Sequence, residues 1–129
     1  MLLRISVAVI LLTHSIPGFI TFDVNKFGSD YLNSVGFAPI GIALAWLIKL
    51  SHVATAICLL FNRFVKLAGF ITIFIFAMGI IMVHFKEGWF VVGGGTNGIE
   101  YNVLLIACLL TIMFTPKKDI YNNPGNIIK

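Results

Sequence analysis

The residues of this chain that could do chemistry are few, and most of them stand inside apolar runs. His14, Lys49 and His52 each interrupt a long stretch of aliphatic and aromatic residues, and Glu100 stands at the mouth of another. An ionisable group in such a place is costly unless it is paired or faces a polar cavity. These residues are therefore candidates for one shared site, and the elements around them decide whether they can meet.

The composition indicates a membrane protein. Of the 129 residues, 59% are hydrophobic and 11% are charged, whereas soluble domains carry about 25% charged residues. A soluble fold of this size could not bury so much apolar surface, so lipid is the expected solvent. The net charge of +4 lies at the chain ends and in one short loop. Basic and aromatic residues do not interleave, and no nucleic-acid partner is predicted.

Four apolar runs predict an all-α protein, a four-helix transmembrane bundle that occupies residues 1–115. The first run has the charged start of a signal peptide, but no small-residue cleavage motif follows it, so we interpret it as an uncleaved span kinked near Pro17. The connector 23–39 is expected to contain a short interfacial helix. The expected spans are about 2–22, 40–61, 64–85 and 99–115, followed by a polar cytoplasmic tail, 116–129.

Basic residues predict the orientation of this bundle. Only Lys26 and Lys86 fall on one side of it, next to acidic residues. The positive-inside rule then places the opposite side, and with it both termini, in the cytoplasm. The basic residues on that side are Arg4, Arg63, Lys66, Lys117, Lys118 and Lys129.

Along these spans the ionisable residues gather in the outer half. His14 lies roughly 12 Å, and Lys49 about 15 Å, from the outer end of its span. His52 follows Lys49 one helical turn deeper on the same face, and His84 and Glu100 lie near the outer ends of their spans. This spacing predicts an outward-opening polar pocket in which Lys49 pairs with Glu100 or hydrogen-bonds His14, while His52 closes the bottom.

Such a pocket could bind a small polar ligand or a quinone headgroup, or move protons. The alternative is that the same residues lock the helices together by hydrogen bonds. A lysine near the middle of a membrane costs roughly 2.5–3.5 kcal/mol on insertion scales, which favours the pocket. The candidate ligand-binding residues are His14, Lys49, His52, His84, Trp89, Glu100 and Tyr101.

Three other patterns, a possible metal site, a pair of cysteines and a glycine-rich run, have more ordinary interpretations. No HxxxH or ExxH pair lies on an expected helix, so no metal site is predicted. Cys58 and Cys108 lie at similar depths in the inner half, where contact is possible but a reducing compartment disfavours a disulfide. The run Gly93–Gly98 fits G-x-G-x-x-G, yet an apolar helix follows it and no second βαβ unit exists. We interpret it as a loop lying over the mouth of the bundle.

The segment GWFVVGGGTNGIEYNVLLIACLL, with His84 just before it, resembles the DoxX family of small four-span bacterial membrane proteins. The opening RISVAVILLTHSIPG is similar to the first helix of that family, and LLFNRFVKLAG is similar to its short second connector. The resemblance covers most of the chain, to about Thr115. One position departs from the pattern, because the second span of the family often carries a glutamate where this chain has His52.

The resemblance implies a multi-pass protein of the bacterial cytoplasmic (inner) membrane. Family members are called oxidoreductase-associated, and relatives include a subunit of a thiosulfate:quinone oxidoreductase. We therefore expect an accessory subunit of a quinone-linked redox complex, with quinone as the candidate cofactor and a membrane redox protein or a second copy of the chain as its partner.

Two alternatives stay open. In a quinone-coupled oxidoreductase, His14, His52 and Glu100 would bind the headgroup and pass protons. A small-solute transporter is the other alternative, although four spans without a repeat or a broken helix pair fit it poorly.

Overall fold

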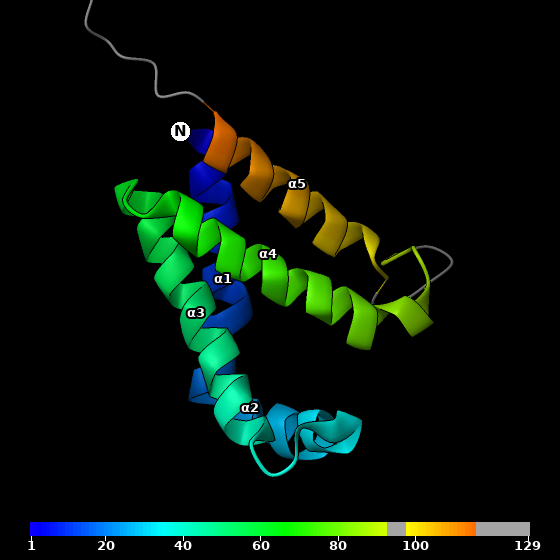
Figure 1. Ribbon diagram of the computed structural model, residues 1–129. Coiled ribbons are helices and arrows are strands. Elements are labelled where there is room, and N and C mark those ends of the chain that lie inside the picture. The colour runs from blue at the N-terminus through cyan, green and yellow to red at the C-terminus, as the bar shows by residue number, and fades with distance from the viewer. Residues whose placement is uncertain (93–97, 116–129) are drawn as a thin grey trace, which may run out of the picture.

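The computed structural model describes residues 1–92 and 98–115, and every regular element in these ranges is a helix (Figure 1). The all-α prediction is confirmed for this part of the chain. The predicted tail, 116–129, and most of the glycine run, 93–97, lie outside the described residues. The elements are α1 (Leu2–Ile20), α2 (Asp23–Lys26), η1 (Phe27–Phe37), α3 (Gly41–Phe61), α4 (Val65–Met82), η2 (His84–Glu87) and α5 (Glu100–Phe114).

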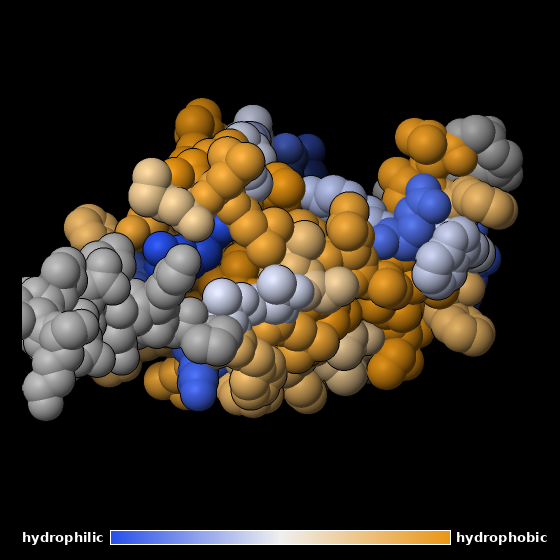
Figure 2. Space-filling view, turned by 90° about the horizontal axis from the view of Figure 1, so that it is seen from above, coloured by the Kyte–Doolittle hydropathy of each residue, from blue (hydrophilic) through white to orange (hydrophobic). Residues whose placement is uncertain are grey.

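Three of these helices are long and apolar enough to cross a membrane. They are α1, α3 and α4, with 19, 21 and 18 residues, while the apolar helix α5 has 15. Large side chains such as Leu47, Phe74 and Ile81 are about two-thirds exposed, and apolar residues cover most of the face in Figure 2. So much contiguous apolar surface is unusual in a soluble monomer and suits contact with lipid.

The four long helices pack as a ring. α1 packs against α3, α3 against α4, α4 against α5, and α5 against α1. The start of α1, the turn between α3 and α4, and the end of α5 gather at one end of the molecule, from which α3 and α4 diverge (Figure 1). The ring is thus closed at one end and wider at the other. Its placement across a membrane as a four-helix bundle, and the orientation of its termini, stay predictions.

The closed end holds the main core, and a polar contact lies inside it. The Thr72 hydroxyl donates a hydrogen bond to Thr55 Oγ1 at 2.8 Å, and Thr55 donates in turn to the Ala68 carbonyl at 3.3 Å. Both hydroxyls are buried, so this pair ties α3 to α4 where water cannot compete. The apolar residues of this core are Val7, Ala8, Leu11, Ala56, Leu59, Phe76, Leu105 and Leu109.

The connector 23–39 folds into helix for most of its length, as α2 and η1, and both pack against α3. The approach of η1 to α3 is a backbone contact. A β-carbon on Gly28 would lie 2.7 Å from the Ile42 nitrogen and 2.8 Å from the Gly41 carbonyl oxygen, so only glycine fits there. The Asn33 side chain completes the contact by accepting a hydrogen bond from the Gly41 amide at 3.0 Å. Together these contacts hold η1 over the wider end of the ring.

The helix ends differ in detail from the expected spans. α1 continues through Pro17 and ends at Ile20, and α4 ends at Met82, so that His84 begins the separate short helix η2. A tertiary contact satisfies the end of α4. The Tyr31 hydroxyl of η1 donates a hydrogen bond to the Met82 carbonyl, which is one of the last carbonyls of a helix and has no partner within it.

Candidate functional site

A cavity of about 700 Å³ is lined by residues of α3 and α4, among others, and these two helices diverge in Figure 1. Its lining comes from all four long helices and from α2 and η1. Most of the lining is apolar and includes Leu44, Ile48, Phe74 and Met78. Sites for small molecules typically enclose about 300–1,000 Å³ and combine an apolar lining with a few polar groups. The cavity is therefore large enough for a ligand, and its polar residues decide which one.

Three basic side chains meet at this cavity, His14 of α1 with Lys49 and His52 of α3, and we call them the basic cluster. Lys49 Nζ donates a hydrogen bond to the backbone carbonyl of His14 at 2.9 Å. The ring centres of His14 and His52 lie 6.2 Å apart. The spacing of three residues puts Lys49 and His52 on one face of α3, as predicted. The cluster therefore joins two helices on one side of the cavity.

His52 has the most unusual surroundings in the cluster. Its side chain is 3% exposed, and the ring centre of Phe76 lies 5.4 Å away. Both ring nitrogens are buried, and neither has a hydrogen-bond partner among the described residues. A neutral imidazole offers one donor and one acceptor, and buried groups of this kind normally have partners. His52 thus keeps its full hydrogen-bonding capacity next to the cavity.

The structure brings five of the seven candidate residues to the cavity lining: His14, Lys49, His52, His84 and Tyr101. The other two lie outside that lining. Trp89 is 53% exposed on the loop after η2, and Glu100 turns back towards that same loop.

Glu100 closes the loop that leads into α5. Its Oε1 accepts a hydrogen bond from the Val91 amide at 2.9 Å, and its own amide donates to the Trp89 carbonyl at 3.0 Å. Within the described ranges no salt bridge joins Lys49 to Glu100. Of the two predicted contacts of Lys49, the structure shows the one with His14, which uses the backbone carbonyl and not the ring. The Glu100 carboxylate is instead taken up by the Val91 amide, nine residues earlier in the same loop.

Polar residues that the sequence pattern did not single out also line the cavity: Asp23, Tyr31 and Asn102. Asn102 is 9% exposed and lies on the buried face of α5 with Leu105 and Leu109. An amide in register with buried leucines at positions i+3 and i+7 is the signal that could have identified it.

Tyr31 connects η1 to α4 at the cavity. Its hydroxyl donates to the Met82 carbonyl at 2.8 Å, and its ring stacks on Phe27 with the ring centres 5.7 Å apart. Tyr31, Phe27 and Met82 all line the cavity. This hydrogen bond therefore fixes the end of α4 against η1.

Tyr31→Phe is expected to keep the stacking and to loosen the end of α4. A hydrogen bond of this kind contributes about 0.5–1.5 kcal/mol, so amide exchange over residues 80–86 should rise by up to roughly tenfold. Hydrogen–deuterium exchange with mass spectrometry measures this directly. Ser29→Ala, which removes an exposed hydroxyl from the same helix, is the matched control. Equal exchange in both variants would show that the Tyr31 hydroxyl does not hold α4.

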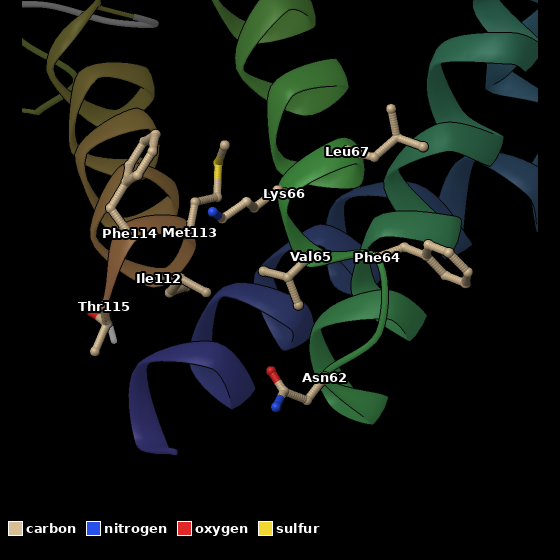
Figure 3. Close-up of a pocket in the computed structure, with 9 residues that line it drawn as sticks. All are labelled: Asn62, Phe64, Val65, Lys66, Leu67, Ile112, Met113, Phe114 and Thr115. Atoms are coloured by element: carbon tan, nitrogen blue, oxygen red, sulfur yellow. The ribbon is translucent and has the colours of Figure 1, made fainter. Parts of the chain in front are cut away.

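A second hollow, of about 630 Å³, lies at the closed end between the start of α4 and the end of α5 (Figure 3). Lys66 reaches into the space between these helices, and its Nζ lies 5.8 Å from the centre of the Phe114 ring. None of the side chains that line this hollow is a buried polar group without a partner. We therefore assign no site to it.

The structure places the candidate metal ligands and the two cysteines as follows. Among the described residues, no group of three or more His, Cys, Asp or Glu side chains could hold a metal ion. Cys58 and Cys108 are both free and half-buried.

Comparison with known proteins leaves the family open, because no family model, no curated protein and no solved structure matches this chain. Membership of the DoxX family stays a prediction, and the cavity and its basic cluster are the basis for inferring function.

Proposed function

We propose that this chain is a DoxX-like protein of the bacterial inner membrane, with both termini in the cytoplasm, that serves as an accessory subunit of a quinone-linked redox complex. The observation that carries the proposal is the cavity of about 700 Å³, whose apolar lining meets the basic cluster. A molecule with a flat polar head and an apolar chain matches this combination of surfaces. In this proposal the cavity holds the quinone headgroup for the complex.

The donors of the basic cluster suit the carbonyl oxygens of such a headgroup. Lys49 carries three N–H donors and uses one on His14, and His52 has an unpartnered ring. Both would donate to a carbonyl oxygen placed between them. A hydrogen bond from a charged donor contributes about 1.5–3 kcal/mol, so these contacts would fix the orientation of the head.

The accessory role is favoured over the two alternatives by specific features. An oxidoreductase that passes protons through His14, His52 and Glu100 would need all three at the cavity, but Glu100 bonds Val91 and lies outside the lining. A transporter would be expected to have a discontinuous helix pair at its binding site, whereas α1, α3 and α4 are continuous.

Native mass spectrometry of the protein released from membranes in mild detergent tests the proposal. With a short-tailed quinone added, we expect one bound molecule, whose affinity falls roughly tenfold in His52→Leu through the lost hydrogen bond. Glu100→Gln is the control and should bind as the wild type does, since this residue lies outside the cavity lining.

The same spectra count copies and protein partners. Co-release of a quinone-dependent enzyme supports the accessory role, and a lone chain that reduces the quinone supports the oxidoreductase. Quinone that binds equally well to wild type and to His52→Leu would refute the cavity as its site.

A further inference from the structure

The charged and titratable residues that line the cavity are mostly basic. Among the described lining residues the one carboxylate belongs to Asp23, which already accepts a hydrogen bond from the Thr21 hydroxyl at 2.6 Å and lies 3.7 Å from Lys26 Nζ. The other lining groups that ionise near neutral pH or carry charge are basic. They are His14, Lys49, His52 and His84.

The unused donors concentrate in the basic cluster. An ammonium group has three N–H donors and no acceptor, and Lys49 spends one donor on the His14 carbonyl. His52 is 3% exposed, and both of its ring nitrogens are without a partner. A ligand group that accepts hydrogen bonds can use both free donors of Lys49 and the N–H of a neutral His52.

An apolar path leads away from the cluster along α4. Gly79 lines the cavity, and a β-carbon built on it would meet no atom within 4 Å. The neighbouring lining residues Phe74 and Met78 are apolar, and Phe74 is 67% exposed. This open space beside Gly79 gives room for an alkyl or isoprenoid chain that continues into surrounding lipid.

We infer that the basic cluster recognises a lipid-like ligand through an oxygen that only accepts hydrogen bonds, a carbonyl or a carboxylate, while the chain of the ligand lies along α4 past Gly79. The inference rests on the proposed use of the cavity as a ligand site, but it does not require the ligand to be a quinone. Charge-assisted hydrogen bonds from Lys49 favour such an oxygen. A cationic head would face the like charge of Lys49.

Probes that share one chain and differ in the head test this inference. Binding of dodecanoate, a dodecyl-substituted benzoquinone and dodecylammonium is measured on the full chain in lipid nanodiscs, with empty nanodiscs subtracted. We expect the carboxylate and the oxidised quinone to bind and the ammonium to give no signal above empty nanodiscs. Lys49→Met should weaken carboxylate binding roughly tenfold or more, the value of one charge-assisted hydrogen bond. Lys66→Met, which removes the same charge at the closed end, should have no effect.

A second variant tests the chain path without touching the cluster. Gly79→Leu fills the open space beside Gly79 and should weaken the binding of both acceptor probes, the carboxylate and the quinone. Its melting temperature should stay close to that of the wild type, because a β-carbon at this position meets no atom within 4 Å. A loss of folding in Lys49→Met would therefore leave the path measurable.

The outcomes separate the inference from the proposed function. Carboxylate binding without quinone binding supports the inference and overturns the quinone-linked role. Quinone binding that ignores the Lys49 substitution, or equal binding of ammonium and carboxylate, overturns the inference. Absence of binding by all three probes overturns both.

Discussion

Gly28→Ala is expected to push η1 away from α3 and to destabilise the packing of η1 on that helix. The new β-carbon would overlap Ile42 Cα and would lie 2.7 Å from the Ile42 nitrogen. These are backbone atoms and cannot rotate away, so the start of α3 or the whole of η1 must shift. Overpacking of this kind costs about 1–3 kcal/mol. We expect a cost near the upper end of this range, because the shift also strains the hydrogen bond between Asn33 and Gly41.

Thermal unfolding in detergent, followed by circular dichroism, measures this effect. Gly79→Ala is the matched control, because its β-carbon meets no atom within 4 Å. In a helix interior alanine is more favourable than glycine by about 0.8–1.0 kcal/mol. This variant should therefore be as stable as the wild type or more stable. An equal fall in melting temperature for both variants would contradict the close approach of η1 to α3.

Lys49→Leu is expected to have the opposite effect on stability. It should make the protein more stable while it removes ligand binding. A lysine near the middle of a membrane helix costs roughly 2.5–3.5 kcal/mol on insertion scales. The single hydrogen bond from Lys49 to the His14 carbonyl offsets only part of this cost. The net gain on substitution should therefore be about 1–2 kcal/mol. Functional sites typically retain polar groups that lower the stability of the folded protein.

Insertion of the isolated α3 segment into microsomes and denaturant unfolding of the whole protein measure this gain. Lys66→Leu is the control, because Lys66 lies in the first turn of α4 and its long side chain can reach the interface. A marked loss of stability in Lys49→Leu would instead support the alternative in which these polar residues only lock the helices together.

The sequence was sufficient to predict the helices but not all of their ends. Long apolar runs predict buried or lipid-facing helices because few other structures satisfy their backbone. The carbonyl of Met82, the last residue of α4, accepts a hydrogen bond from the hydroxyl of Tyr31, 51 residues away. The fold of η1 depends on a glycine contact with the start of α3. Neither contact leaves a periodic signal in the sequence, so local patterns could not reveal them.

The candidate site shows the same division. Counting depth along the helices placed His14 level with Lys49, and the structure confirms their contact. The position of Glu100 could not be predicted in this way, because the nearest amide of its own loop competes for the carboxylate. The membrane placement of the whole cluster and its ligand remain predictions. Their tests are the binding and insertion experiments described above.

The short length of α5 has a consequence for the surrounding bilayer. Its 15 residues extend for about 22 Å, against roughly 30 Å for the hydrocarbon layer of an average membrane. In a bundle that crosses the bilayer, this hydrophobic mismatch is relieved by local thinning of the lipid beside α5. Thin membrane regions then become the preferred surroundings of the protein, and the cavity-lining residues Tyr101 and Asn102 at the start of α5 are brought closer to the headgroups. Membrane thickness would in this way influence how readily a ligand reaches the basic cluster.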